Sequence, residues 1–237
     1  MPGQGERWSR AELKEALRAY LQIVAWAKEA AADDFSPAQF HRDLSRGVLH
    51  PRSEGSIGRR MGNITVVLAA ARQPVTGRYG SSLTHVGPGP TATLLELLDE
   101  LREEAVTPSA DANVAMQRAS IILASGQVPK PAGNRSPAKR EGAAVAIYVR
   151  DPKVVAWVLQ ESGGVCEACE NAAPFLRPSG QPFLEVHHVR RLADDGPDVI
   201  ENAIAVCPNC HRRLHHGADR VAFRRHLLKR VSRLVPA

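Results

Sequence analysis

No apolar run in this sequence is long enough to cross a bilayer, which excludes a protein anchored by a membrane-spanning helix. Residues 1–6 lack the apolar core of a signal peptide, so we expect a cytoplasmic protein. No internal repeat emerges. Cysteine is scarce, because the 237 residues contain four, all between positions 166 and 210. Disulfides are not expected in a reducing compartment, so these cysteines need another role.

The four cysteines form two Cys-x-x-Cys pairs, Cys166/Cys169 and Cys207/Cys210. Two such pairs separated by a few tens of residues are typical of a tetrahedral zinc site. Two disulfides or a redox pair are the alternatives, and a reducing compartment disfavours both. We therefore predict one structural zinc held by four thiolates.

Histidines gather within and just after this cysteine frame. His211 and His215 are four residues apart, which places them on one face of a helix. His187 and His188 end a predicted strand, where adjacent side chains point to opposite faces and should have different roles. Because four thiolates close the zinc site, these imidazoles are left to converge on a second ion or a phosphate.

The order of these residues resembles a known family. Residues 184–189, then Asn202, then residues 207–215 are similar to an HNH nuclease of the ββα-metal type. Over roughly residues 145–235 the sequence resembles the nuclease half of McrA-type modification-dependent (type IV) restriction endonucleases. The resemblance implies a metal-dependent DNA endonuclease that hydrolyses phosphodiester bonds in modified DNA, of the methylated-cytosine type. Hydroxymethylcytosine, methyladenine and a phosphorothioate backbone are the alternative modifications.

The resemblance also implies catalytic roles. His188 corresponds to the general base, and Asn202 to the asparagine that holds the hairpin loop and, through it, the base. His187 and His211 correspond to ligands of the catalytic cation. His215 is expected to be a third ligand or a phosphate contact.

The implied cofactors are one structural zinc and one catalytic divalent cation. Neutral imidazoles favour Mn, Co, Ni or Zn over Mg, although water and phosphate oxygens make Mg workable. Glu185 lies in the same strand as the histidine pair, and we expect it to be structural, with support of the metal ligands as the alternative.

The net charge of +6 is unevenly distributed. Residues 1–125 contain 14 Lys/Arg and 14 Asp/Glu, whereas residues 126–237 contain 17 and 11. Basic groups beside catalytic histidines suit DNA phosphate binding. Near the histidines we expect DNA contacts at Arg190, Arg191, Arg212 and Arg213. For residues 220–233 alone, a solvated basic helix face is an equal alternative.

The predicted fold is mainly α with a small α+β domain. Residues 1–125 read as a helical DNA-recognition domain, in which Ser9 and Ser36 start helices and further helices span about 56–71, 91–104 and 109–124. Residues 126–146 are rich in Pro and Gly and predict a flexible basic linker. Residues 147–237 form the zinc-stapled HNH nuclease domain, with caps expected at Asp151 and Asp219.

DNA contacts in the first half are expected at Arg52, Arg59, Arg60 and Tyr79. Ser53 and the arginines that follow it suit a phosphate at a helix N-terminus, and a well-capped structural helix is the alternative. Tyr79 lies in a long loop and is a candidate for stacking on a flipped modified base.

The expected partner is double-stranded DNA carrying a modification. One nuclease motif cuts one strand, so double-strand cleavage requires either a homodimer or two successive nicks. The alternatives are a sequence-specific HNH or homing-type nuclease of unmodified DNA and a non-catalytic zinc-stapled DNA-binding protein. Retention of His188, Asn202 and His211 favours catalysis over the last of these.

Overall fold

The computed structural model describes residues 7–26, 35–80, 86–137, 139–140 and 147–235. The chain divides into two compact units. The first unit comprises residues 1–104 with the short segments 124–126 and 177–181, and the second comprises residues 105–123, 127–176 and 182–237. Residues 105–123, which the sequence suggested for the recognition domain, therefore group with the second unit. Among the described residues no helix is both long enough and apolar enough to cross a membrane.

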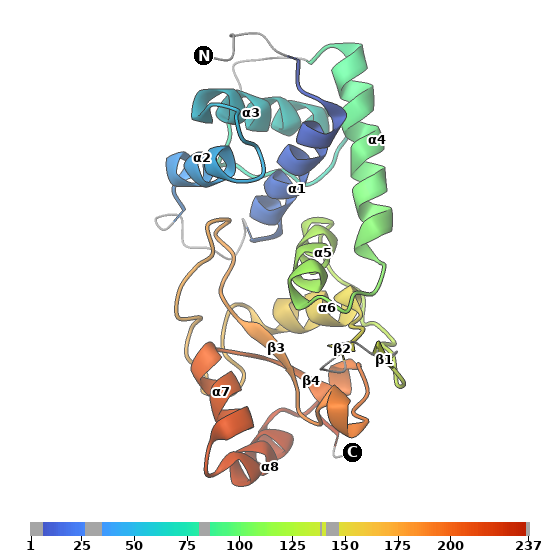
Figure 1. Ribbon diagram of the computed structural model, residues 1–237, viewed down its shortest axis with the longest axis vertical. Coiled ribbons are helices and arrows are strands. Elements are labelled where there is room, and N and C mark those ends of the chain that lie inside the picture. Colours follow the sequence, from blue (N-terminus) through green and yellow to red (C-terminus); the bar gives the residue numbers. More distant parts are fainter. Residues whose placement is uncertain (1–6, 27–34, 81–85, 138, 141–146, 236–237) are drawn as a thin grey trace. The chain divides into compact units, whose positions relative to one another are not determined.

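The first unit is helical in its described residues (Figure 1). Its helices are α1 (Arg10–Trp26), α2 (Pro37–Arg46), α3 (Glu54–Ala70) and α4 (Pro88–Ala105). The capping box predicted for α1 is confirmed, because the Ser9 N–H donates to Glu12 Oε2 (2.7 Å) and the Glu12 N–H donates to Ser9 Oγ (3.2 Å). The Ser36 cap of α2 is confirmed as well, with its hydroxyl accepting from the N–H of Gln39.

The third helix begins earlier than predicted. Ser53 is its N-cap, and the Ser53 hydroxyl accepts from the Ser56 N–H. The core of the unit forms where α1 and α2 pack on α3. The side chains of α1 that are buried in this core include Leu13, Leu17, Tyr20, Leu21 and Val24. The Tyr20 hydroxyl also hydrogen-bonds Thr65 of α3 (3.0 Å), so its one polar atom is satisfied inside the core.

A row of ion pairs joins α1 to α4. The cations lie on α1 and the carboxylates on α4, and the pairs are Arg10–Glu96, Arg10–Glu100, Lys14–Glu100, Lys14–Glu104 and Arg18–Glu104. Exposed pairs of this kind contribute about 0–1 kcal/mol each. Three carboxylates of α4 are thus paired within the unit.

The first part of the predicted flexible linker, residues 127–137, is packed within the second unit. Val128 is buried, and its N–H donates to Gln160 Oε1 (2.8 Å). Asn134 and Asp198 exchange two backbone hydrogen bonds of 2.6 Å. Gly133 lies so close to Asp198 and Val199 at φ +68° that a side chain would collide with them. Residues 138 and 141–146 of the predicted linker lie outside the described residues.

The second unit is built on a two-stranded antiparallel sheet of β3 (Glu185–His188) and β4 (Ala203–Val206) (Figure 1). α6 (Pro152–Ser162) and α7 (Pro208–His216) pack on this sheet, and α8 (Arg220–Arg230) packs on α7. Most of α5 (Ala112–Ala124) belongs to the same unit. Smaller elements are the β1 (Lys139–Arg140)–β2 (Ile147–Tyr148) pair and the 3-10 turns η1 (Leu192–Asp194) and η2 (Ile200–Asn202). The order β3, β4, α7 is a ββα unit, so the predicted fold class is confirmed.

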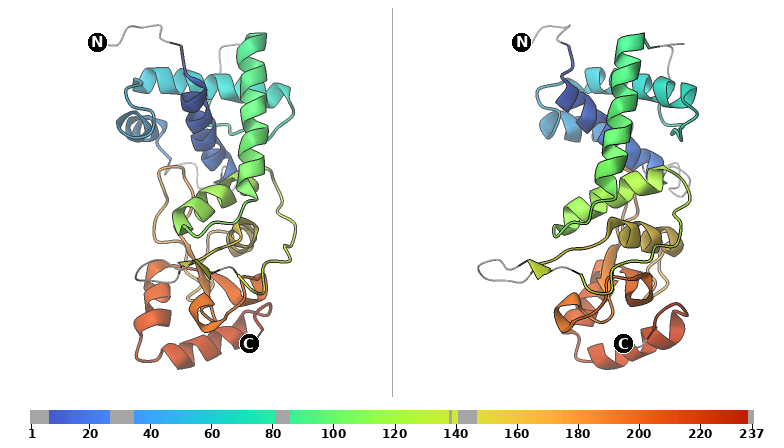
Figure 2. Two further views of the ribbon diagram at one scale, coloured as in Figure 1. Left: turned by 45° about the vertical axis from the view of Figure 1, so that its right-hand side comes forward. Right: turned by 90° about the vertical axis from the view of Figure 1, so that its right-hand side faces the viewer.

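Helix caps position the elements of the second unit. Asp151 caps α6 as predicted, because its carboxylate accepts from the Lys153 N–H (2.8 Å). Asp219 precedes α8 but makes no side-chain cap, because its carboxylate pairs with Arg213 of α7. The Arg213 guanidinium also lies 4.0 Å from the ring of Phe223. These contacts hold α7 and α8 side by side, as both views of Figure 2 show.

Candidate active site

The four cysteines converge at the base of the ββα unit. All four are free thiols, and their Sγ atoms lie within 4.8 Å of one another. The Cys207 N–H donates to Cys166 Sγ (3.2 Å), and the Glu170 N–H donates to the carbonyl of Cys166 (2.8 Å). Four sulfur donors at this spacing match tetrahedral zinc.

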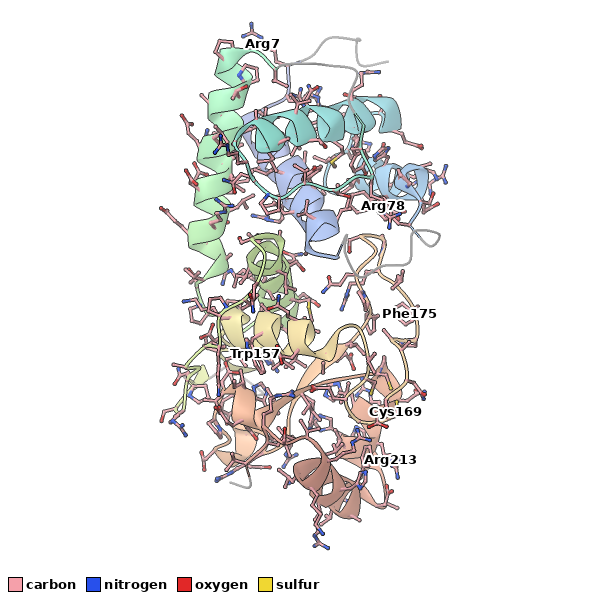
Figure 3. The ribbon with its side chains drawn as sticks, turned by 180° about the vertical axis from the view of Figure 1, so that it is seen from behind. Arg7, Arg78, Trp157, Cys169, Phe175 and Arg213 are labelled. Atoms are coloured by element: carbon pink, nitrogen blue, oxygen red, sulfur yellow. The ribbon has the colours of Figure 1, made fainter. Side chains whose placement is uncertain are left out.

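Glu167, inside the first Cys-x-x-Cys pair, connects the four-cysteine cluster to β4 and to the C-terminal segment. Its carboxylate accepts from the Ala205 N–H of β4 (2.7 Å) and pairs with Arg233 near the end of the chain. Figure 3 shows Cys169 and Arg213 in the same region of this unit, the first from the cysteine turn and the second from α7. The frame therefore fixes the start of α7, on which two of the histidines lie.

Three imidazoles form a second cluster beside this frame. His187 comes from β3, and His211 and His215 come from consecutive turns of α7. Their ring centroids are 4.8–4.9 Å apart, and one ligand atom from each lies within 4.8 Å of the others. His187 Nε2 is buried without a hydrogen-bond partner. A buried nitrogen of this kind needs a partner, and a divalent cation supplies one.

Two imidazoles of the cluster have lowered pKa values. Burial, together with the neighbouring His211 and His215, lowers the pKa of His187 to about 3. Burial, followed by His211, also lowers the pKa of His215. A neutral imidazole has a lone pair, which is the form that binds a metal ion.

Glu185 supports the cluster directly. Side chains two residues apart on a strand share a face, so Glu185 and His187 both face α7. Glu185 Oε2 lies 2.7 Å from His211 Nδ1. A carboxylate that accepts from Nδ1 leaves the lone pair of His211 Nε2 available to a metal ion, so the contact favours support of this candidate ligand, the less favoured of the two expectations.

His188 lies on the opposite face of β3, as strand alternation predicts. Its Nε2 atom is 2.8 Å from Oδ1 of Asp198, a side chain that is 0% exposed. The sequence analysis assigned no role to Asp198 and missed this contact. A signal was available, because Asp198 is an acid between the candidate base and Asn202 on a loop that must fold back over the strand.

Asn202 holds this loop closed. Its amide nitrogen donates to the carbonyls of Arg190 (2.9 Å) and Pro197 (2.8 Å), and its amide oxygen accepts from the Arg190 N–H (2.8 Å). The Val189 N–H, directly after His188, donates to the carbonyl of Asn202 (2.8 Å). The side chain therefore fixes both ends of the segment that follows the base.

The expected DNA-contacting arginines of the second unit differ in their surroundings. Arg191 forms a two-pronged pair with Asp194 (2.7 and 2.9 Å), and Arg190 Nε donates to the Asp194 carbonyl (2.8 Å). Arg213 is paired with Asp219. Arg212 is exposed and has no ion-pair partner in the described part of the chain.

In the first unit most of the candidate DNA contacts have internal partners. Arg52 pairs with Glu12, and both Arg52 and Arg60 lie over the ring of Trp8 at 5.2 and 4.9 Å. Arg59 is exposed. The helix after Ser53 is well capped, as in the structural alternative.

Tyr79 is not on the surface of its loop. It is 8% exposed, its ring is stacked on His41, and its hydroxyl lies 3.1 Å from His41 Nε2. The ring of Tyr20 covers it at 6.1 Å. Burial raises the pKa of Tyr79. The described conformation leaves no open ring face for a base, so nothing in it supports the expected stacking role.

Comparison with known proteins finds a family model that matches the region of this site. Residues 166–217 match the model of the HNH endonuclease family. Over 127 residues the chain is 40% identical to the type IV methyl-directed restriction enzyme EcoKMcrA of Escherichia coli K12. The match covers 54% of this chain and 45% of that relative, so the chain spans less than half the length of the relative.

Among solved structures, the chain is similar to the type IV phosphorothioation-dependent restriction endonuclease ScoMcrA. The sequence identity is 31%, the match covers 58% of this chain and 25% of that one, and the TM-score is 0.34.

Proposed function

We propose that this chain, which carries an HNH endonuclease domain over residues 166–217, is a metal-dependent DNA endonuclease. The observation that carries the proposal is the hairpin of the ββα unit. There His188 directly follows His187 in β3, His187 meets His211 and His215 of α7, and Asn202 pins the loop. A base, a cation site and a fixed loop are the parts that phosphodiester hydrolysis requires.

In the proposed mechanism His188 is the general base, whose imidazole accepts a proton from the water that attacks the phosphodiester. Asn202 keeps the segment after His188 in place. His187, His211 and His215 would hold a divalent cation, which would supply stabilisation of charge on the phosphate and on the leaving oxygen. Mn, Co, Ni and Zn suit three imidazoles better than Mg does.

The four thiolates hold a structural zinc and take no part in the reaction. All four ligand positions of a tetrahedral site are then filled by sulfur, which leaves no place for substrate. The proposal places the protein in the cytoplasm, where a reducing environment keeps Cys166, Cys169, Cys207 and Cys210 as thiols.

We assign the chain to restriction of modified DNA, with methylated cytosine as the proposed modification. The relative that supports this is named a methyl-directed restriction enzyme and is 40% identical over 127 residues. The proposed recognition surface is the basic stretch 42–78 of the first unit, on which Arg46 and Arg59 are exposed. A homodimer would place one active site on each strand.

The test is digestion of matched plasmids in four forms: unmodified, cytosine-methylated, adenine-methylated and phosphorothioated. Each is incubated with the full chain and Mn²⁺, Co²⁺, Ni²⁺ or Mg²⁺. The expected result is cleavage of the cytosine-methylated plasmid alone. Equal cutting of all four forms would exclude modification dependence and favour a nuclease of unmodified DNA.

Two histidine substitutions test whether the cleavage arises at this site. His188→Ala is expected to abolish cleavage while zinc content and DNA binding stay at the parent level. His226→Ala removes an exposed histidine of α8 and is the matched control, expected to cut like the parent. Retained cleavage by His188→Ala would refute the assigned base, and parent protein that binds but never cuts DNA would favour a non-catalytic role.

A further inference from the structure

Asp198 is the only acidic side chain that is buried among the residues the structure describes. An ionised carboxylate away from water is costly unless hydrogen bonds satisfy both of its oxygens. Here both are satisfied, Oδ1 by His188 Nε2 (2.8 Å) and Oδ2 by the Asp151 N–H (2.5 Å). One of the two partners is thus the imidazole that we propose as the general base.

The anchoring of Asp198 restricts its movement. The Asp151 N–H belongs to the N-cap of α6, so one carboxylate oxygen is attached to the start of a helix. The backbone of Asp198 is paired in both directions with Asn134 (2.6 Å each). Backbone and side chain are therefore both held by segments outside the hairpin, and the imidazole of His188 receives a fixed partner.

The donor and acceptor roles in this contact determine the tautomer of His188. A carboxylate only accepts hydrogen bonds, so Nε2 of His188 carries the ring proton. A neutral imidazole has one N–H, and Nδ1 is then left with a lone pair. No hydrogen bond reaches Nδ1 from the residues that the structure describes. A lone pair on a nitrogen of fixed direction is what a general base requires.

We propose that Asp198 is a positioning residue that fixes the orientation and the tautomer of His188, so that Nδ1 is the nitrogen that receives the proton from water. The inference rests on the proposed nuclease function for its catalytic consequence. The hydrogen-bonding arrangement that it describes exists whether or not the protein cleaves DNA, so the two can fail separately.

The substitution Asp198→Asn tests the tautomer with almost no change of volume. The amide keeps its hydrogen bond from the Asp151 N–H only if its oxygen faces that group. Its NH₂ group then faces His188 Nε2, which must become the acceptor, and the proton moves to Nδ1. By analogy with the same change in a serine-protease triad, the single-turnover cleavage rate is expected to fall by roughly 10³- to 10⁴-fold.

Four measurements on Asp198→Asn distinguish a positioning role from a purely structural one: the cleavage rate, KM, DNA affinity and zinc content. With positioning, the cleavage rate falls while KM, DNA affinity and zinc content remain at parent values. The matched control is Asp195→Asn, an exposed carboxylate in the same loop at φ +57°, a conformation that asparagine tolerates. It is expected to cut at the parent rate. An Asp198→Asn protein that is folded and cuts as fast as the parent overturns the proposal.

The tautomer itself is read by ¹⁵N NMR of histidine side chains in the full chain, with zinc at the cysteine site and diamagnetic Mg²⁺ present. His188→Ala identifies the His188 signals. The parent is expected to show the Nε2-protonated form, and Asp198→Asn the Nδ1-protonated form. A parent spectrum with the proton on Nδ1 overturns the proposal even if Asp198→Asn does not fold. If the parent cuts no DNA, the proposed function fails, and this spectrum still decides the position of the proton.

Discussion

Removal of the Glu185 carboxylate is expected to weaken cation binding at the histidine cluster without touching a ligand. Glu185 Oε2 lies 2.7 Å from His211 Nδ1, and this contact sets which nitrogen of His211 faces the cluster. The Nε2 atom so presented is 3.2 Å from Nε2 of His215. In Glu185→Ala nothing sets the tautomer or the rotation of the His211 ring before the cation binds. Part of the binding free energy must then be used to order the ring.

The size of the effect follows from this loss of orientation. Removing the hydrogen-bond partner of a metal-ligating histidine costs about 10- to 100-fold in metal affinity. That range corresponds to roughly 1.4–2.7 kcal/mol, since each tenfold change is about 1.4 kcal/mol. Glu185→Gln keeps an acceptor oxygen but loses the charge, so its loss is expected to be about tenfold or less.

The assay is isothermal titration of Mn²⁺ or Ni²⁺ into the full chain with its cysteine site already filled by zinc. Glu161→Gln is the control, because Glu161 is an exposed acid of α6 away from the histidines. The expected order of affinity is parent and Glu161→Gln, then Glu185→Gln, then Glu185→Ala. Equal affinity of Glu185→Ala and the parent would refute the assigned support of His211.

Three further predictions concern the frame and the packing. Cys207→Ser is expected to lose the bound zinc, measured by elemental analysis, and to unfold at a lower temperature. Gly133→Ala should lower the free energy of unfolding by roughly 2–4 kcal/mol in a urea titration, because it adds a collision to a positive φ. A hydrogen bond from Arg52 lowers the pKa of Glu12 to about 2, so its stabilisation is present above pH 4.5 and is lost as the pH falls through about 2. Glu12→Gln should therefore cost about 1–2 kcal/mol at pH 7 and nothing near pH 2.

Each of these three has a result that contradicts it. Zinc retained at one ion per chain in Cys207→Ser would mean that the four thiolates do not form one site. For Gly133→Ala the matched control is Gly163→Ala, because Gly163 also has a positive φ (+53°) but has open space around the new Cβ. An equal loss of unfolding free energy in both variants would show that the collision at Gly133 contributes nothing. A Glu12→Gln protein whose stability changes with acid as the parent does would show that the Arg52 contact is not what stabilises the first unit.

The metal clusters were predictable because their geometry is set locally. A Cys-x-x-Cys turn brings two thiolates together within four residues, and the spacing of His211 and His215 is one helical turn. The structure brings both clusters together as expected, whereas the catalytic roles of their members stay predictions. Strand alternation also predicted correctly that His187 and His188 face different partners.

The unpredicted contacts depend on segments that are distant in the sequence. Asp198 hydrogen-bonds Asp151 and Asn134, which lie 47 and 64 residues earlier in the sequence. A local sequence pattern cannot predict contacts over such separations. The composition of residues 126–146 predicted a flexible linker. The first part of this segment is nevertheless packed against the rest of its unit, because Val128 is buried and Gly133 lies too close to Asp198 and Val199 for any side chain. Tyr79 was a candidate for stacking on a base because it lies in a long loop, whereas its ring is buried in the apolar interior.

Many of the arginines of the second unit are already bound within the protein, and this sets how strongly its DNA affinity should respond to salt. Arg191, Arg213 and Arg233 each pair with a carboxylate of the same unit. Each phosphate that a protein neutralises adds about 0.9 to the slope of log affinity against log salt concentration. A count of the 17 basic residues would predict a steep slope, but a cation that keeps its own carboxylate releases few ions from DNA. The slope should therefore be shallow, and a steep one would show that these internal pairs open when DNA binds.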